Sequence, residues 1–126
     1  MSDIKKYELE YIIKSSPGML YNRLSTPDGL SLWFADDINV EKGIFTFIWD
    51  GNEQQARIVD QKMNKYIRFQ WIDKEDDTYF EFRIEKDDLT SEVALIVIDF
   101  TDEDELEEAT QLWDSQINNL MRILGS

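Results

Sequence analysis

The sequence predicts an α+β domain in which a curved antiparallel sheet wraps around a long C-terminal helix. Residues 5–14 and most of 38–100 alternate polar and apolar side chains, which is the period of a half-buried strand. Turn residues break the second stretch at short intervals, which favours an antiparallel meander over βαβ units. From residue 102 onward the apolar side chains recur at helical spacing. We therefore expect six or seven strands and one closing helix.

The first strand and two short helices are predicted within the first 34 residues. Strand 5–14 places Tyr7, Leu9, Tyr11 and Ile13 on one face. Ser16-Pro17 and Thr26-Pro27 each combine a capping hydroxyl with a proline that the first helical turn tolerates. The inward side chains of the two helices are expected to be Met19, Leu20, Leu24, Leu30 and Trp33.

The strands of the meander are expected at 44–49, 54–61, 66–72, 78–85 and 92–100. Asp50-Gly51 is a hairpin dipeptide that favours positive φ, and residues 63–65 and the acidic stretch 73–77 supply further turns. Arg68 and Gln70 are expected on the face opposite to Ile67, Phe69 and Trp71. Strand 92–100 is almost continuously apolar, so we expect it to be covered on more than one side.

The closing helix has the clearest pattern. Asp102 is expected to cap it, with Glu105 at the third helical position, and Gly125 to end it. A helix of about 20–22 residues is roughly 30–33 Å long, enough to cover most of such a sheet. Its apolar stripe is expected to hold Leu106, Ala109, Trp113, Ile117, Leu120, Met121 and Leu124.

Composition excludes several classes of function. The 126 residues, 42% of them hydrophobic, predict one domain (1–126) with one core. The absence of Cys and His excludes disulfides, thiolate metal sites and Ser-His-Asp catalysis, so we expect no catalytic set, metal site or cofactor. A net charge of −14 argues against nucleic acid and anionic membranes as partners. No signal peptide or membrane-length apolar run is present, and we expect a cytoplasmic protein.

Three segments, in the right order, carry a family resemblance that covers nearly the whole chain. They are LYNRLSTPDGLSLWF (20–34), with its Trp33-Phe34 pair, IVDQKMNKYIRFQW (58–71), with Val59 at a recurrent apolar position, and LWDSQINNLMRIL (112–124). They resemble the Aha-type family of activators of heat-shock-protein ATPase and their bacterial homologues, within the START-like (SRPBCC) superfamily. The resemblance implies the helix-grip fold and a cavity between the concave face of the sheet and the final helix. The chain departs from the family in two ways. It is short, which suggests trimmed loops and a smaller cavity, and Leu112 stands where many relatives carry Gly, so we do not expect the close backbone approach that Gly permits.

The predicted function is noncatalytic binding of a small hydrophobic or lipid-like ligand in that cavity. Alternatively, the side chains between the sheet and the final helix fill this space completely and leave little or no cavity. The strand pattern and the helix stripe propose the lining residues Phe45, Phe47, Trp49, Ile67, Phe69, Trp71, Phe80, Phe82, Trp113, Ile117 and Leu120.

Two other functions stay open. A protein-interaction or co-chaperone-like module would use the acidic run 102–108, which could equally serve to stabilise the start of the helix. An enzyme would have to rely on Asp, Glu, Tyr or Arg, and we favour a protein without catalysis. We expect a monomer or a weak homodimer, with Leu112 and Ile123 beside the main stripe as a possible contact.

Several polar side chains are further candidates. Arg57, Arg68 and Arg83 would orient an anionic headgroup if they pointed inward, although we expect Arg68 and Arg83 to point outward. Asp99 is either a buried carboxylate or the exposed end of its strand, and we favour the exposed end. Asp36-Asp37 would border a cavity mouth or bind a cation, although a solvated loop is the simpler interpretation. Hydroxyl groups for a ligand would come from Tyr11, Tyr66 and Tyr79.

Overall fold

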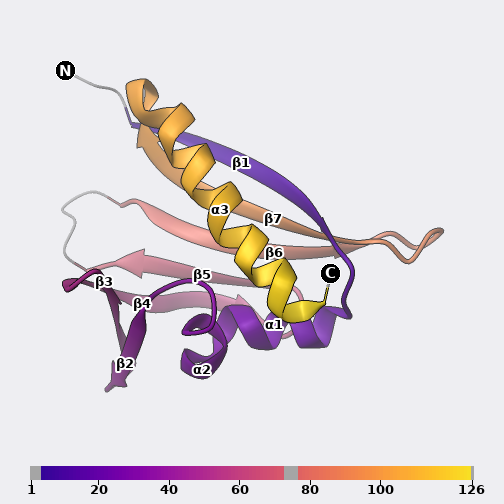
Figure 1. Cartoon of the computed structure of the whole chain (residues 1–126), viewed down its shortest axis with the longest axis horizontal. Coiled ribbons are helices and arrows are strands. Elements are labelled where there is room, and N and C mark those ends of the chain that lie inside the picture. Colours follow the sequence, from indigo (N-terminus) through magenta and orange to yellow (C-terminus); the bar gives the residue numbers. More distant parts are fainter. Residues whose placement is uncertain (1–3, 73–76, 126) are drawn as a thin grey trace.

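A computed structural model describes residues 4–72 and 77–125, which leaves most of the predicted acidic turn 73–77 outside the described residues. The described chain forms one seven-stranded antiparallel sheet with α3 lying diagonally across it (Figure 1). The strand order is β1-β7-β6-β5-β4-β3-β2. The strands are β1 (Ile4–Ile13), β2 (Asp37–Glu41), β3 (Ile44–Trp49), β4 (Asn52–Lys62), β5 (Tyr66–Trp71), β6 (Tyr79–Lys86) and β7 (Val93–Asp102). The helices are α1 (Pro17–Ser25), α2 (Pro27–Leu30), the 3-10 turn η1 (Glu103–Glu105) and α3 (Leu106–Leu124). The predicted fold class is confirmed.

Tight hairpins connect most of the sheet. Asp50 and Gly51 have φ of 48° and 81°, and Asn64 has φ of 64°, so both predicted turns are confirmed. Lys42 and Gly43 form a further turn, with φ of 53° and 79°, between β2 and β3. No range was predicted for β2. Between Ile58 and Asp60 the pairing of β4 with β5 shifts register. Val59 lies at this irregularity and is 44% exposed, so its expected place in the apolar pattern is wrong.

Both short helices begin at the predicted caps. The Ser16 hydroxyl accepts a hydrogen bond from the Met19 N–H at 3.2 Å, and the Thr26 hydroxyl accepts one from the Gly29 N–H at 2.9 Å. A methyl group on Gly29 would lie 2.5 Å from the Asn22 carbonyl oxygen, so only glycine fits where α2 packs on α1. Of the five side chains expected to point inward, Met19 is 53% exposed and the other four are buried.

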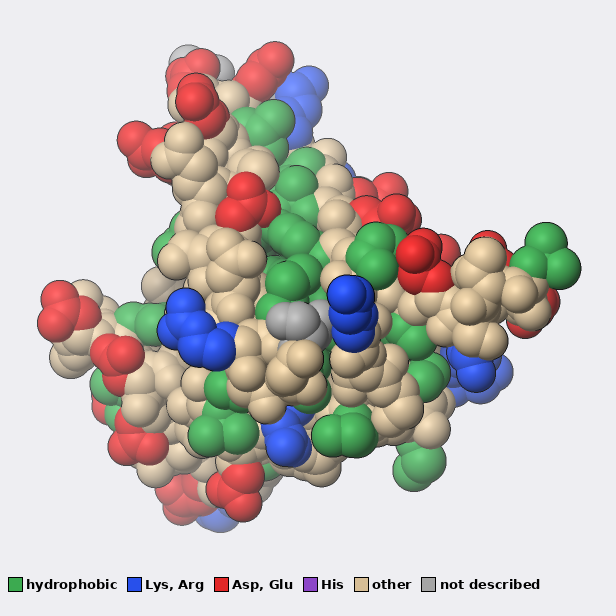
Figure 2. All heavy atoms as spheres, turned by 45° about the vertical axis from the view of Figure 1, so that its right-hand side comes forward, with side chains coloured by type: hydrophobic (Ala, Val, Ile, Leu, Met, Phe, Trp, Pro, Cys, Tyr) green, Lys and Arg blue, Asp and Glu red, His purple; other side chains and the backbone are tan. Residues whose placement is uncertain are grey.

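The start of α3 differs from the prediction. Asp102 still belongs to β7 and makes no side-chain capping hydrogen bond, and η1 precedes the first α-helical residue, Leu106. Figure 1 shows α3 beginning at the end of the molecule where β1 and β7 extend past the other strands, and Figure 2 shows acidic side chains gathered there. Leu106 is accordingly 36% exposed rather than part of the buried stripe. Gly125 ends the helix with φ of 74°, as predicted.

The buried core lies on the face of the sheet that α1, α2 and α3 cover. Buried residues of all three helices, such as Leu24, Leu30 and Ile117, pack in one cluster with the inward side chains of the strands. On β7, Leu95 and Val97 belong to this cluster. Ile98 lies on the opposite face of the sheet, because successive side chains of a strand alternate between the two faces, and it is also buried. The expectation that this strand is covered on more than one side is therefore confirmed.

Long side chains provide the cover on the outer face. Glu81 is 1% exposed and accepts hydrogen bonds from Arg68 Nε at 2.7 Å and from Arg83 Nη1 at 2.6 Å. The Arg68 guanidinium lies 4.0 Å from the centre of the Tyr79 ring, and that of Arg83 lies 4.8 Å from the Tyr66 ring. Both arginines point away from the core, as predicted, and shield the carboxylate from water.

We expect Glu81→Gln to lower the free energy of unfolding by about 1–3 kcal/mol, because the two arginines lose a charged acceptor. Both arginine side chains are partly exposed, 36% and 43%, so they can regain water and the loss stays below that of a fully buried pair. Urea denaturation measures the difference. Glu85→Gln is the matched control on the same strand, because Glu85 is exposed. Equal stability of the Glu81 and Glu85 variants would contradict this role for Glu81.

Candidate functional site

Aromatic side chains fill the centre of the concave face. The rings of Phe69 and Phe80 stack with centroids 4.9 Å apart, and Phe47 and Phe82 pack edge-on around Phe80 at 6.2 and 5.6 Å. Eight of the eleven predicted lining residues are at most 5% exposed in this core: Phe45, Phe47, Ile67, Phe69, Phe80, Phe82, Ile117 and Leu120. They line neither of the two hollows described below, and their contact with a ligand stays a prediction.

A hollow of about 370 Å³ lies beside α3, and we call it the aromatic hollow. Three predicted lining residues reach it: Trp49 at the end of β3, Trp71 at the end of β5, and Trp113 from α3. Trp49 and Trp71 are half-buried, so their rings are accessible at the edge of the core. The described residues that line it are Phe34, Trp49, Gln54, Trp71, Asp99, Leu112, Trp113 and Gln116.

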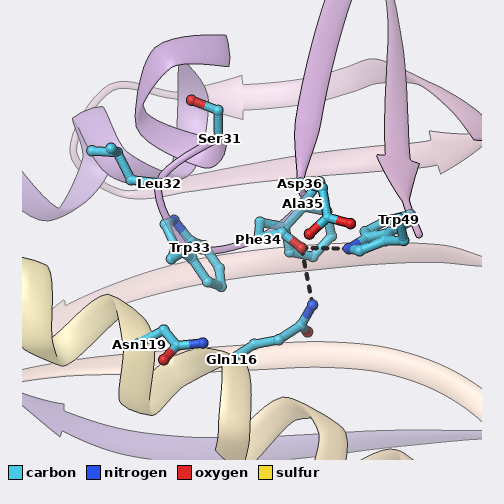
Figure 3. A pocket seen from close by; sticks show the side chains of 9 residues that line it. All are labelled: Ser31, Leu32, Trp33, Phe34, Ala35, Asp36, Trp49, Gln116 and Asn119. Atoms are coloured by element: carbon cyan, nitrogen blue, oxygen red, sulfur yellow. Dashed lines mark hydrogen bonds between the residues drawn. The ribbon is translucent and has the colours of Figure 1, made fainter. Parts of the chain in front are cut away.

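A second hollow of about 430 Å³, the polar hollow, lies between the loop after α2 and α3 (Figure 3). Its lining is Ser31, Leu32, Trp33, Phe34, Ala35, Asp36, Trp49, Gln116 and Asn119. Phe34, Trp49 and Gln116 line both hollows and form the wall between them. Two hydrogen bonds hold this wall, because the Phe34 carbonyl accepts from Trp49 Nε1 at 2.6 Å and from Gln116 Nε2 at 3.0 Å.

Among the described residues that line the aromatic hollow, Asp99 carries a carboxylate. Its Oδ2 atom accepts hydrogen bonds from Trp113 Nε1 at 2.9 Å and from the Tyr7 hydroxyl at 3.3 Å. The side chain is half-buried beneath α3, so the favoured interpretation of an exposed strand end is wrong. Burial, and next the charge of Asp99, raise the pKa of Tyr7 well above its ordinary value. Tyr7 therefore stays a protonated donor to Asp99 over the physiological pH range.

The other polar candidates lie away from the two hollows or have structural contacts. Tyr11 donates to Asp114 at 2.6 Å, and burial, followed by this hydrogen bond, raises the pKa of Tyr11. The Asp36 carboxylate borders the polar hollow and accepts from the Asp50 N–H at 2.7 Å, which ties the loop to the β3–β4 turn. Asp37 is exposed and accepts from the adjacent Ile38 N–H.

The remaining candidates, Arg57, Tyr66 and Tyr79, are not among the residues that line either hollow. Tyr66 and Tyr79 lie under the arginines of the outer face, and Arg57 is exposed. Within residues 4–72 and 77–125, no group of three or more Asp or Glu side chains could hold a metal ion.

Five described lining residues of the aromatic hollow were not predicted as such: Phe34, Gln54, Asp99, Leu112 and Gln116. The Trp33-Phe34 pair of the family resemblance drew attention to Phe34, and the replacement of a family glycine drew attention to Leu112. No feature of the sequence indicated Gln54 and Gln116, because a polar side chain at the edge of a strand or helix is ordinarily expected to face solvent. Their place at the site follows from how the elements pack.

The chain belongs to the START-like superfamily, because the model of the START-like superfamily domain matches residues 1–126. It is similar to a protein of Bacteroides fragilis solved by NMR, with 36% identity, a TM-score of 0.69, and coverage of 98% of this chain and 92% of that chain. The Aha1 dimer from Colwellia psychrerythraea has 19% identity and a TM-score of 0.80 over 95% of this chain and 96% of that chain. A Mesorhizobium loti protein has 15% identity and a TM-score of 0.79, with 96% and 97% coverage.

The predicted likeness to the Aha-type fold is thereby confirmed. No curated protein matches the sequence. In the described part of the chain, none of the helices is long and apolar enough to cross a membrane.

We expect Gln116→Ala to lower the free energy of unfolding by about 1 kcal/mol, the usual contribution of one hydrogen bond. The loss should not be larger, because the Phe34 carbonyl keeps its bond from Trp49. Urea denaturation measures the change, with Asn119→Ala as control on the same flank of α3. A crystal structure of the variant should show the two hollows joined. A loss equal to that of the control would mean that Gln116 does not hold the wall.

Proposed function

We propose that the chain acts as one noncatalytic binding domain whose aromatic hollow takes a small hydrophobic or aromatic molecule. The observation that carries the proposal is the lining, whose described residues are five apolar or aromatic side chains and three polar ones: Phe34, Trp49, Trp71, Leu112 and Trp113, with Gln54, Asp99 and Gln116. Mostly apolar walls with a few convergent polar groups are typical of ligand pockets, whose volumes run from about 300 to 1,000 Å³. The hollow of about 370 Å³ falls at the small end of that range.

The packing of the core supports a ligand beside α3 rather than deep beneath it. Phe47, Phe69 and Phe80 occupy the centre of the concave face with exposures of 0–1%. A ligand there would have to displace stacked rings, at a cost of several kcal/mol for each well-packed aromatic side chain. A compact aromatic molecule or one with a short chain fits this proposal better than a long-chain lipid. A cytoplasmic location stays a prediction from the sequence.

The binding test uses the neutral fluorophore N-phenyl-1-naphthylamine. We expect saturable binding, with quenching of tryptophan emission, because three tryptophans line the aromatic hollow. Gln54→Trp should weaken binding at least tenfold, because Gln54 is exposed at the edge of the hollow and a larger side chain would fill it. Leu89→Trp adds the same side chain at a residue that is 95% exposed on the β6–β7 turn and is the matched control. Unsaturable binding, or equal affinity for both variants, would reject the proposal.

A second candidate function is a protein-interaction module that acts through the acidic run 102–108. Glu103, Asp104, Glu105, Glu107 and Glu108 are all exposed. Reversing Glu103, Glu105 and Glu108 to Lys should abolish capture of a basic partner in a pull-down, and added salt should weaken capture by the wild type. Capture that survives this charge reversal would exclude the acidic run as the docking surface.

Association of two copies belongs to the same candidate. Leu112 and Ile123 are 62% and 38% exposed on α3 and are available for a contact. The Colwellia relative is described as a dimer, and its likeness to this chain concerns the fold. A monomer or weak homodimer therefore stays a prediction for this chain.

A further inference from the structure

Strand β1 leaves one edge of the sheet open for pairing. It stands first in the strand order, and in the described sheet it pairs with β7 alone, without a break in register from Ile4 to Ile13 (Figure 1). Alternate residues of an antiparallel strand direct their N–H and C=O groups to opposite sides, so half of these groups face away from β7. An open edge of this length is a template for a further strand.

The outward-facing side chains of β1 form a self-complementary pattern around Glu8. When a second copy of β1 pairs antiparallel about a twofold axis at Glu8, Ile4 lies opposite Ile12 and Lys6 lies opposite Glu10. The twofold axis forms each of these pairs twice. Side chains directly opposite one another have Cβ atoms about 4.5–5.5 Å apart, where opposite charges attract. The isoleucine pairs remove apolar surface from water.

The inward-facing side chains of β1 match in the same register. Tyr7 lies opposite Leu9, and both are half-buried side chains that pack against the edge of the core. Lys5, which is exposed, lies opposite Tyr11 and can extend its apolar stem over the ring. A second copy therefore covers apolar surface on both faces of β1.

The groups that make up this pattern are available to a partner. Lys6, Glu8 and Glu10 are exposed, and within the described part of the chain they form no ion pair. Ile4 and Ile12 are 50% and 44% exposed, so an apolar side chain faces water at each end of the pattern. Pairing with a second copy gives each of these charges and apolar groups a partner, apart from Glu8.

A hollow of about 330 Å³ on the outer face of the sheet supports the same register, and we call it the acidic hollow. The described residues that line it are Glu10, Ile12, Glu85, Lys86, Asp87, Glu92 and Ala94. Four carboxylates against one ammonium group favour a cation there. In the twofold pair, Lys6 of the second copy meets Glu10 at the rim of this hollow. Ile4 of the second copy extends the apolar contact of Ile12.

From these observations we infer that two copies of the chain associate through antiparallel pairing of their β1 strands, with Glu8 on the twofold axis. This contact is separate from Leu112 and Ile123 on α3 and does not depend on the aromatic hollow, so it goes beyond the proposed function. Glu8 faces its own copy across the axis, and like charges directly opposite one another repel. One added strand pair is also a small interface, so the association is weak and reversible.

Sedimentation velocity over a concentration series up to about 1 mM, at an ionic strength of about 0.15 M, measures the dimer affinity. Lys6→Glu should weaken the dimer about tenfold, because two attractive pairs become repulsive. The double variant Lys6→Glu/Glu10→Lys exchanges the charges and should regain the wild-type affinity within about threefold. Lys65→Glu is the matched control, because it makes the same change of charge at an exposed residue of the β4–β5 turn and should leave the affinity unchanged.

Glu8 provides two further readouts. Glu8→Gln removes the like charges on the axis and should strengthen the dimer by about threefold. The chain has no Cys of its own, so Glu8→Cys places one thiol of each copy at the axis, where a short bismaleimide should link the two copies. Arg57→Cys is the control, because Arg57 is exposed on β4 in the interior of the strand order and should give no linked dimer.

Three outcomes would overturn the inference. One is a chain that stays monomeric throughout the concentration series. A dimer that withstands Lys6→Glu but dissociates with Ile123→Lys would place the contact on α3 instead. If the charge-exchanged variant fails to regain affinity, or both cysteine variants are linked equally, β1 does not pair with Glu8 on the axis.

Discussion

Phe34 is the residue through which the loop after α2, the sheet and α3 are joined. Its ring packs against Phe47, Phe80 and Trp113 with centroids 5.1, 5.4 and 5.9 Å away. Its carbonyl accepts N–H groups from Trp49 of β3 and Gln116 of α3. A poorly hydrated carbonyl without donors is costly, so the loop settles where both donors reach it. The positions of both hollows follow from this constraint, because Phe34 is a wall of each.

The density of the aromatic core determines where free space remains. Rings from β3, β5 and β6 contact one another and close the centre of the concave face, with Phe34 and Trp113 above them. Space is left at the flank of α3, where Trp49 and Trp71 end their strands and are only half-buried. Binding at this edge requires no opening of the core, so a ligand contributes its own contacts without the cost of unpacking rings.

The alternation of side chains across the sheet places the carboxylates of Glu81 and Asp99 in different environments. Glu81 faces outward and is neutralised by two guanidinium groups at 2.7 and 2.6 Å. Asp99 faces α3 and is held by the neutral donors Trp113 and Tyr7. Glu81 therefore stabilises the sheet with its charge matched, whereas Asp99 connects β7 to Trp113 of α3 and to Tyr7 of β1.

The sequence by itself determined most of the elements and the faces of most of their side chains. Period-two alternation, the Ser16 and Thr26 caps, the Asp50-Gly51 turn and the stripe through Trp113 all depend on neighbours a few residues apart, and all appear in the structure. The predicted start of α3 is wrong, because the acidic run has the composition of a helix cap although β7 continues to Asp102. Only the tertiary structure decided the site. Residues 34, 49, 71, 99 and 113 meet there because the sheet coils and the loop lands on α3, and the gap that packed rings leave is a property of their three-dimensional fit, which residue spacing does not encode.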